Sequence, residues 1–354
     1  MSRSTKIILG RLGFIGCLGL QVSCSPRVAT SFWRIGTEAD SVRPGYTVIH
    51  AEGKTRHCYP ISEWHASPEV DTYHQLHHHG VAVESELMAY RIYFDKKQTI
   101  DPYCKRSPQL ELAKSYWYPN DSLLAAGFGD DILRVSGTVG VGSVKYWNLL
   151  SPITDNRSPL RHIEPVAERS ERIVRQTRNS ATIEVAVKDW QVEDKSVEMV
   201  TQYTMQAGHR DMRCDVQLSE PVSGLCTGVQ SIPAKGPNQK SEFINLNLEN
   251  GVLLASWGTD WPVNDSAKYA KETVGLAVFI PKAYAGELVH DKQNNLCLLN
   301  LTGAESAGLT AKRSKKCAAH FYLTICGATK ENHPVATNAT EWFTYLRRWA
   351  KHLH

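Results

Sequence analysis

The sequence of 354 residues lacks the short motifs by which the common nucleotide-dependent, hydrolytic and zinc-dependent enzymes are recognised. It contains no nucleophile elbow, Walker loop, dinucleotide-binding fingerprint or HExxH pair, which argues against common hydrolases, kinases, dehydrogenases and zinc proteases. The basic residues are spread along the chain, with a formal net charge of +4, and form no stripe that would follow a phosphate backbone. We therefore expect no nucleic-acid partner.

Cysteine supplies no metal or redox motif. There are nine cysteines, and none of them forms a CxxC pair or has zinc-ligand spacing. Seven lie beyond the N-terminal segment, so at least one of these thiols stays free. An oxidising compartment would permit disulfides, but the spacing does not define their pairing.

Long apolar runs are missing as well, apart from a short one at the N-terminus. Arg3, Lys6 and Arg11 precede the apolar run Leu12–Leu20, which is too short to span a bilayer and fits the core of a signal peptide. Ser23 and Cys24 then resemble a lipoprotein cleavage site, although Gln21 is a poor residue at its position. We expect residues 1–24 to be a signal peptide or lipoprotein signal, with lipidation of Cys24. The protein would then be exported, and periplasmic or anchored to the outer membrane; a buried N-terminal strand or helix is the alternative.

Strand patterns dominate the rest of the chain. Hydrophobic residues make up 42% and charged residues 21%, which is ordinary for a globular protein with a sizeable core. Residues 25–70 look irregular, and residues 71–354 look like a single β-sandwich domain. The expected strands beyond residue 130 are 131–137, 182–190, 197–205, 212–218, 243–248, 252–257, 273–280 and 319–325. The three from 182 to 218 are spaced as in a β-meander.

Helical patterns are few. A single turn is expected at Asp121–Ala126, and a longer helix at Ala336–Leu353, where Trp342, Leu346 and Trp349 form an apolar stripe. The predicted fold class is therefore all-β, with few helices and a C-terminal helix.

One run, Val81–Phe94, is interpreted as a single long strand. Its parity places Glu84 and Glu86 on one face and Arg91 on the other. Two carboxylates spaced in this way could hold a cation or raise the pKa of one of them, but exposed strand glutamates explain the pattern equally well. An arginine within apolar sequence needs an anionic partner, either a structural Asp or Glu or a substrate carboxylate. Asp101, Tyr103 and Lys105 follow closely and could share the site.

A histidine cluster, His74 to His79, precedes this run. Adjacent histidines point in different directions, so no more than two of them can bind one metal together. Three interpretations stay open: loop histidines bonded to backbone, substrate binding or proton transfer by His78 or His79, and metal ligation.

Two adjacent acids, Asp130 and Asp131, follow the glycines of Gly127-Phe128-Gly129. This pattern suits a loop that approaches a ligand or a calcium ion, or a turn capped by aspartate. A site without a cofactor, or one with a divalent cation held by Glu84, Glu86 and Asp130, is compatible with the sequence. Trp117 and Trp147 are candidate sugar-stacking platforms, the alternative being ordinary core tryptophans.

Several strings of the sequence, taken in order, resemble the domain-of-unknown-function family DUF4861. They are residues 77–94 (HHHGVAVESELMAYRIYF), 99–101, 127–135 (GFGDDILRV), Gly140, Gly142, Trp147 and 341–343 (EWF). The resemblance covers roughly residues 75 to 350, with one departure at Cys104, where glycine is expected. It implies a secreted or periplasmic bacterial protein with a β-supersandwich like that of galactose mutarotases. It also implies a genomic setting beside pectin- and uronate-degrading enzymes, without assigning a reaction.

Together these features suggest a carbohydrate-active enzyme, a lyase or a hydrolase, acting on uronic-acid-containing poly- or oligosaccharides. In an elimination, Arg91 or Lys105 would neutralise the uronate carboxylate, while His78, His79 or Tyr103 would move the proton. In a hydrolysis, an acid/base pair would come from four carboxylates: Glu84, Glu86, Asp130 and Asp131. The alternatives are a non-catalytic glycan-binding lipoprotein and a sugar epimerase of the mutarotase type.

Overall fold

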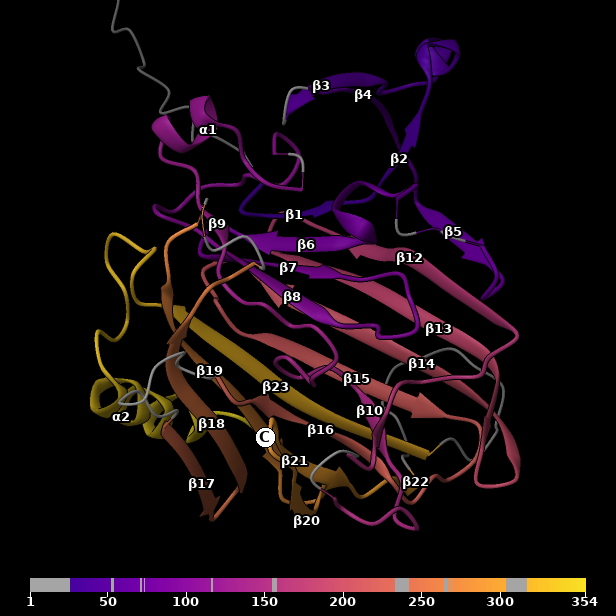
Figure 1. The fold of residues 1–354 in the computed structure, drawn as a ribbon, viewed down its shortest axis with the longest axis vertical. Coiled ribbons are helices and arrows are strands. Elements are labelled where there is room, and N and C mark those ends of the chain that lie inside the picture. The colour runs from indigo at the N-terminus through magenta and orange to yellow at the C-terminus, as the bar shows by residue number, and fades with distance from the viewer. Residues whose placement is uncertain are drawn as a thin grey trace, which may run out of the picture.

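The computed structural model describes residues 26–51, 54–70, 72, 74–115, 117–154, 158–232, 242–263, 267, 269–303 and 317–354. Within these residues the fold is mostly β, arranged in four antiparallel sheets of ten, five, five and three strands with two α-helices. Figure 1 shows β6, β7 and β8 lying across the large sheet, with β2–β4 and α1 beyond them. The all-β prediction with few helices is confirmed at this level.

The ten-stranded sheet has the order β17-β18-β19-β23-β15-β14-β13-β12-β5, with β22 pairing beside β23. Its strands are β5 (Glu63–Ala66), β12 (Glu168–Gln176), β13 (Ser180–Val192), β14 (Lys195–Gln206), β15 (Met212–Leu218), β17 (Glu242–Leu248), β18 (Gly251–Asp260), β19 (Glu272–Pro281), β22 (Thr302–Gly303) and β23 (Cys317–Gly327). β13 pairs with β14, and β14 pairs with β15, so the predicted meander is confirmed.

Two five-stranded sheets pack on this large sheet. The first contains β1 (Val28–Ser31), β6 (Ala82–Ser85), β7 (Met88–Ile92), β8 (Ile100–Cys104) and β9 (Asp130–Asp131). The second contains β10 (Lys145–Trp147), β11 (Leu160–Arg161), β16 (Leu225–Gln230), β20 (Ala285–His290) and β21 (Asn294–Leu299). The three-stranded sheet consists of β2 (Trp33–Gly36), β3 (Thr47–Ala51) and β4 (Lys54–Pro60).

The helical elements are short. The α-helices are α1 (Asp121–Ala125) and α2 (Ala339–Ala350), and the 3-10 helices are η1 (Glu38–Val42) and η2 (His77–His79). Both α-helices begin at an asparagine whose side chain accepts a backbone N–H of the first turn, Asn120 from Leu123 and Asn338 from Glu341. The C-terminal helix expected at Ala336–Leu353 is therefore present, slightly shorter than the apolar pattern suggested.

Alternation along the strands builds two cores, one on each face of the large sheet. On β18, Leu254 packs into the main core between the sheets, whereas Leu253 and Trp257 face the other way. That second face is covered by α2, which buries Trp342 and Leu346 against it. Figure 1 shows α2 lying beside β18 and β19, on the far side from the centre of the molecule.

The run Val81–Phe94 is a hairpin and not the single strand that its composition predicted. β6 and β7 pair antiparallel, with Ala82 opposite Arg91. The Ser85 hydroxyl oxygen accepts the backbone N–H of Leu87 at 3.0 Å, and this contact closes the turn without glycine or proline. Glu84 and Glu86 consequently do not share a strand face, because Glu84 lies within β6 and Glu86 lies in the turn after it.

The N-terminal part is more regular than expected. The segment 25–70, which looked irregular, contains the strands β1 to β5. The proposed signal segment and Cys24 lie outside the described residues. The seven cysteines from Cys58 to Cys326 are all free thiols, and no described helix is long and apolar enough to cross a membrane.

Candidate functional site

Arg91 lies at the centre of a buried ion cluster on β7, β8 and β9. The residue is 2% exposed, and its Nη2 lies 2.5 Å from Asp101 Oδ2 and 3.2 Å from Asp131 Oδ2. Its Nη1 donates to the Trp117 carbonyl at 2.6 Å. The anionic partner that the sequence demanded is therefore a pair of aspartates from two neighbouring strands.

Asp101 and Asp131 share the guanidinium of Arg91, and both carboxyl groups are buried away from water. Burial is the main reason that the pKa of Asp131 is well above its ordinary value, and the neighbouring Asp101 raises it further. Burial likewise raises the pKa of Asp101, against the opposing effect of Arg91. Because one cation cannot balance two buried anions, the cluster favours holding a proton on its carboxylates.

The histidine segment forms a tight backbone turn before β6. His78 and His79 have φ values of 60° and 61°, in the left-handed region that residues other than glycine rarely adopt. Gly80 follows, and a Cβ there would lie 2.0 Å from the Ile92 carbonyl oxygen. The glycine is thus required for the segment to approach β7, which brings His79 beside the ion cluster.

His77 and His78 have structural roles within this turn. Nε2 of His77 bonds to the Ser115 carbonyl at 2.7 Å, and Nε2 of His78 bonds to the Leu112 carbonyl at 2.8 Å. Burial lowers the pKa of His77 to about 4 and that of His78 well below its usual value. Both rings are thereby kept neutral and fixed on the backbone, which is the first of the three interpretations of the cluster.

His79 belongs to an aromatic group beside the cluster. Its ring stacks on Trp117, with centroids 4.2 Å apart, and meets Tyr93 edge-on at 5.6 Å. Tyr93 in turn donates its hydroxyl to Asp101 Oδ2 at 2.6 Å. Trp117 and Tyr93 are half-buried, so part of this aromatic group reaches the surface.

Glu84 and Lys105 form a second buried ion pair beside Tyr103. Lys105 Nζ contacts Glu84 Oε2 and also donates to the carbonyls of Ser85 and Gln109, both at 2.6 Å. The same carboxylate accepts the backbone N–H groups of Glu111 and Leu112. All three ammonium protons are used, so Lys105 and Glu84 hold the 105–112 segment onto the hairpin.

Tyr103 lies in the same layer and is completely buried. Its hydroxyl donates to the Gly129 carbonyl at 2.9 Å, and burial raises its pKa. A Cβ at Gly129 would lie 1.6 Å from the Cys104 carbonyl oxygen, so only glycine allows this loop to pass β8. The Gly-rich string thus places the two aspartates that follow it against Arg91.

Asp130, next to Asp131 on β9, is buried as well, being 7% exposed against 5% for Asp131. Burial raises its pKa, while the charges of Lys330 and Arg91 oppose this effect and that of Glu272 adds to it. Lys330 Nζ lies 2.9 Å from Glu272 Oε1. The sequence analysis did not identify Glu272 or Lys330, because Glu272 begins β19 and Lys330 lies in the turn after β23, both far along the chain and without any local motif.

Two predicted site residues lie elsewhere. Glu86 accepts the Arg27 Nε–H at 2.8 Å and the Gly208 N–H at 3.0 Å, and these contacts hold its pKa below its usual value although burial opposes them. Trp147 is 5% exposed and packs in a core cluster with Cys226 and Leu296. Within the described residues, no three His, Cys, Asp or Glu side chains are placed to hold a metal. Glu84, Glu86 and Asp130 therefore do not converge on a cation.

Comparison with known proteins gives one informative result. Residues 43–354 match the family model described as "Domain of unknown function (DUF4861)". No curated protein matches the chain significantly. Among solved structures, it is similar to a TPR-domain containing protein from Parabacteroides distasonis ATCC 8503, with 9% identity and a TM-score of 0.37. That match covers 89% of this chain but only 57% of the other, and a similarity this low contributes nothing to assigning a fold type or a function.

Proposed function

This chain belongs to the DUF4861 family, and we propose that it is a carbohydrate-active enzyme that works by general acid–base catalysis at the Arg91 cluster. The observation that carries the proposal is the excess of buried carboxylates over cations around Arg91. Carboxyl groups with raised pKa values, next to partly exposed aromatic rings, are the groups that glycoside cleavage uses.

Asp130 is the proposed proton donor. Its pKa is raised by burial, and at 7% exposed it keeps more contact with solvent than Asp101, which is completely buried. Glu272, ion-paired with Lys330, is the proposed second carboxylate of the reaction. Trp117 and Tyr118 are half-buried, and their rings would stack on the sugar.

The internal ion pairs that Arg91 and Lys105 already form favour hydrolysis over elimination as the proposed reaction. An elimination needs a cation to neutralise the uronate carboxylate, but Arg91 and Lys105 already hold internal carboxylates. The histidine and glutamate pair of a mutarotase-type epimerase is also engaged, because His78 bonds to backbone and Glu84 to Lys105. Uronic-acid-containing oligosaccharides of the pectin type remain the proposed substrates, cleaved by water.

The finer fold type is part of the same proposal. A ten-stranded sheet carrying two five-stranded sheets on one face supports a β-supersandwich of the galactose-mutarotase type. The proposed export and lipid anchoring at Cys24 would place the enzyme where such oligosaccharides enter a bacterial cell.

The test is incubation of the purified protein with pectin- and ulvan-type oligosaccharides, measuring reducing ends and the ultraviolet absorbance of unsaturated uronides together. We expect reducing ends without new absorbance, and a loss of about 100-fold or more in Asp130→Asn. Arg172→Gln, a change of an exposed arginine paired with Glu184, is the matched control and should stay active. Absorbance rising with reducing ends would replace the hydrolase by a lyase. Binding without either signal would replace the enzyme by a glycan-binding protein.

A further inference from the structure

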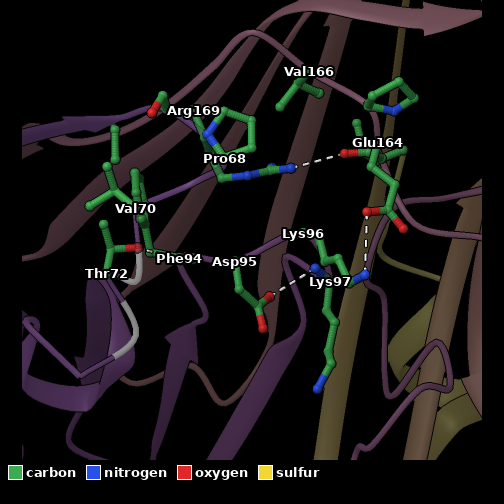
Figure 2. Close-up of a pocket in the computed structure, with 14 residues that line it drawn as sticks. Pro68, Val70, Thr72, Phe94, Asp95, Lys96, Lys97, Glu164, Val166 and Arg169 are labelled. Carbon is green, nitrogen blue, oxygen red and sulfur yellow. Dashed lines mark hydrogen bonds and ion pairs between the residues drawn. The ribbon is translucent and has the colours of Figure 1, made fainter.

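A pocket of about 490 Å³ opens at the far end of β7, beyond the aromatic group. Its walls come from the loop after β5, the turn after β7 and the segment before β12, and Figure 2 shows their side chains facing one space. Pro68, Val70, Phe94 and Val166 supply an apolar lining. The volume lies in the range of sites that enclose a small molecule.

The pocket contains a buried arginine whose partners are neutral. Arg169 is 6% exposed, and Figure 2 shows its side chain extended across the pocket. Its Nη1 donates to the Gln98 side-chain oxygen at 2.6 Å and its Nη2 to the Ile163 carbonyl at 3.0 Å. Across the residues described, Arg169 makes no ion pair within 4 Å, and these two bonds use two of its five N–H donors.

The carboxylates at the pocket are committed elsewhere. Asp95 Oδ1 accepts the backbone N–H groups of Lys97 and Gln98 and so closes its own turn. Glu164 lies 3.5 Å from the exposed Lys96, a contact that Figure 2 also shows. Neither Asp95 nor Glu164 therefore forms an ion pair with Arg169. Burial lowers the pKa of Arg169, and the charges of both carboxylates oppose this effect.

Two further buried titratable groups lie behind the pocket, Lys145 and Glu171. Lys145 is completely buried, and its Nζ contacts the Lys97 carbonyl and lies 3.3 Å from His162 Nδ1. Among the described residues no carboxylate is bonded to it, and burial lowers the pKa of its ammonium group to about 7. Glu171, on the same strand face as Arg169, is also buried, and burial raises its pKa well above the ordinary value. Glu171 Oε2 accepts the backbone N–H of Val81 at 2.7 Å, so this carboxyl is held at the start of β6 and, among the described residues, forms no ion pair with Arg169 within 4 Å. Isolated buried cations are costly unless an anion joins them.

We infer that this pocket binds a small organic acid, whose carboxylate pairs with Arg169 and whose ring-sized body packs on Phe94, Pro68 and Val166. A guanidinium matches a carboxylate in a planar, two-bond geometry, and the apolar walls favour a compact ring over a free inorganic anion. The site is distinct from the Arg91 cluster and does not depend on the proposed enzymatic activity.

The test is a calorimetric titration of the purified chain with benzoate and with D-galacturonate. Benzyl alcohol, methyl galactoside and inorganic phosphate are titrated in parallel. We expect a Kd on the order of 1 mM or below for at least one of the two acids. Their neutral counterparts should bind at least about 10-fold more weakly, since they leave Arg169 without an anion. Equal binding of acid and neutral compound would overturn the inference, and binding of phosphate alone would reassign the site to inorganic anions.

Two variants locate the binding. Arg169→Gln removes the charge, and Val166→Trp fills the pocket without touching the arginine, so the second variant decides the matter if the first one does not fold. Each should weaken the acid by about 10-fold or more. Arg172→Gln, three residues along the same strand, is the matched control and should bind as the parent does. Unchanged binding in Val166→Trp would show that the acid binds elsewhere.

Discussion

Two arginines lie buried in strands of this protein, and their surroundings are opposite. Arg91, 2% exposed, contacts two aspartates and a carbonyl. Arg169, 6% exposed, contacts an amide oxygen and a carbonyl. The first centre has two carboxylates on one cation, and the second, within the described residues, has a cation with no carboxylate within 4 Å. The first is therefore suited to holding a proton and the second to holding an anion.

The comparison shows why burial alone does not identify a binding arginine. A guanidinium that already holds internal carboxylates has little left to offer a charged substrate. One held by neutral oxygens keeps its attraction for an anion. This difference shifts the proposed chemistry at Arg91 from uronate binding to acid–base catalysis, and moves anion recognition to the pocket at Arg169.

The largest effect on stability is expected from removing Arg91, the cation of the cluster with Asp101 and Asp131. Arg91→Met leaves Asp101 and Asp131 buried without a counterion, and we expect a loss of about 5 kcal/mol in the free energy of unfolding. Arg169→Met leaves no carboxylate unpaired and should cost clearly less, about 1–3 kcal/mol. Urea unfolding at neutral pH measures both. Equal losses would contradict the contrast between the two centres.

The Glu84–Lys105 pair contains a second buried cation whose hydrogen-bond donors are all used by internal partners. Lys105→Met leaves Glu84 buried with backbone donors alone, and should cost about 4 kcal/mol in unfolding free energy. Adding Glu84→Gln to that variant should recover part of the loss, because no buried charge then remains. Urea unfolding of the single and double variants tests this. A double variant no more stable than Lys105→Met would indicate that the backbone contacts dominate.

The neutral, buried histidines of the turn before β6 predict that the stability of the protein depends on pH. The pKa of His77 is about 4 in the folded protein against 6.5 as its ordinary value, so below pH 6.5 the unfolded chain binds the extra proton. Stability should fall as the pH drops from about 6.5 to about 4, by about 3 kcal/mol from this group. Unfolding free energies of the parent and of His77→Gln across this range should converge toward low pH. Parallel curves would show that His77 is not responsible.

The smallest effect is expected at the exposed pair of the hairpin turn. Arg27, whose side chain is 53% exposed, contacts Glu86, and Arg27→Ala should change the unfolding free energy by less than about 1 kcal/mol. Thermal unfolding in low and high salt checks this, since screening should remove most of the difference. A loss comparable to that of Arg91→Met would mean that exposure does not separate the two kinds of arginine.

The strands that sequence reasoning placed well are those that bury one face. From β13 to β15 the side chains alternate between core and solvent, so both their limits and their pairing follow from the pattern. The hairpin of β6 and β7 is buried on both faces, so it shows no alternation, and its turn is closed by the Ser85 hydroxyl and contains no glycine. Sequence reasoning could not divide such a run.

The candidate site was predictable in part, for a similar reason. An arginine within apolar sequence indicated a buried cation, and the nearby Asp101 proved to be one of its partners. Asp131 joins it only through β9, a strand of two residues that no periodicity can reveal. Arg169 was missed because β12 carries charged residues on both faces, so its sequence does not show which side chains point inward.

The most direct test of the contrast between the two arginines is a crystal of the protein soaked in 4-bromobenzoate and measured at the bromine absorption edge. We predict an anomalous bromine peak in the pocket between Phe94 and Val166, with the carboxylate on Arg169 and none at Arg91. A peak at the Arg91 cluster, or no peak at Arg169 with the pocket open to solvent in the crystal, would contradict the assignment of anion binding to the arginine with neutral partners.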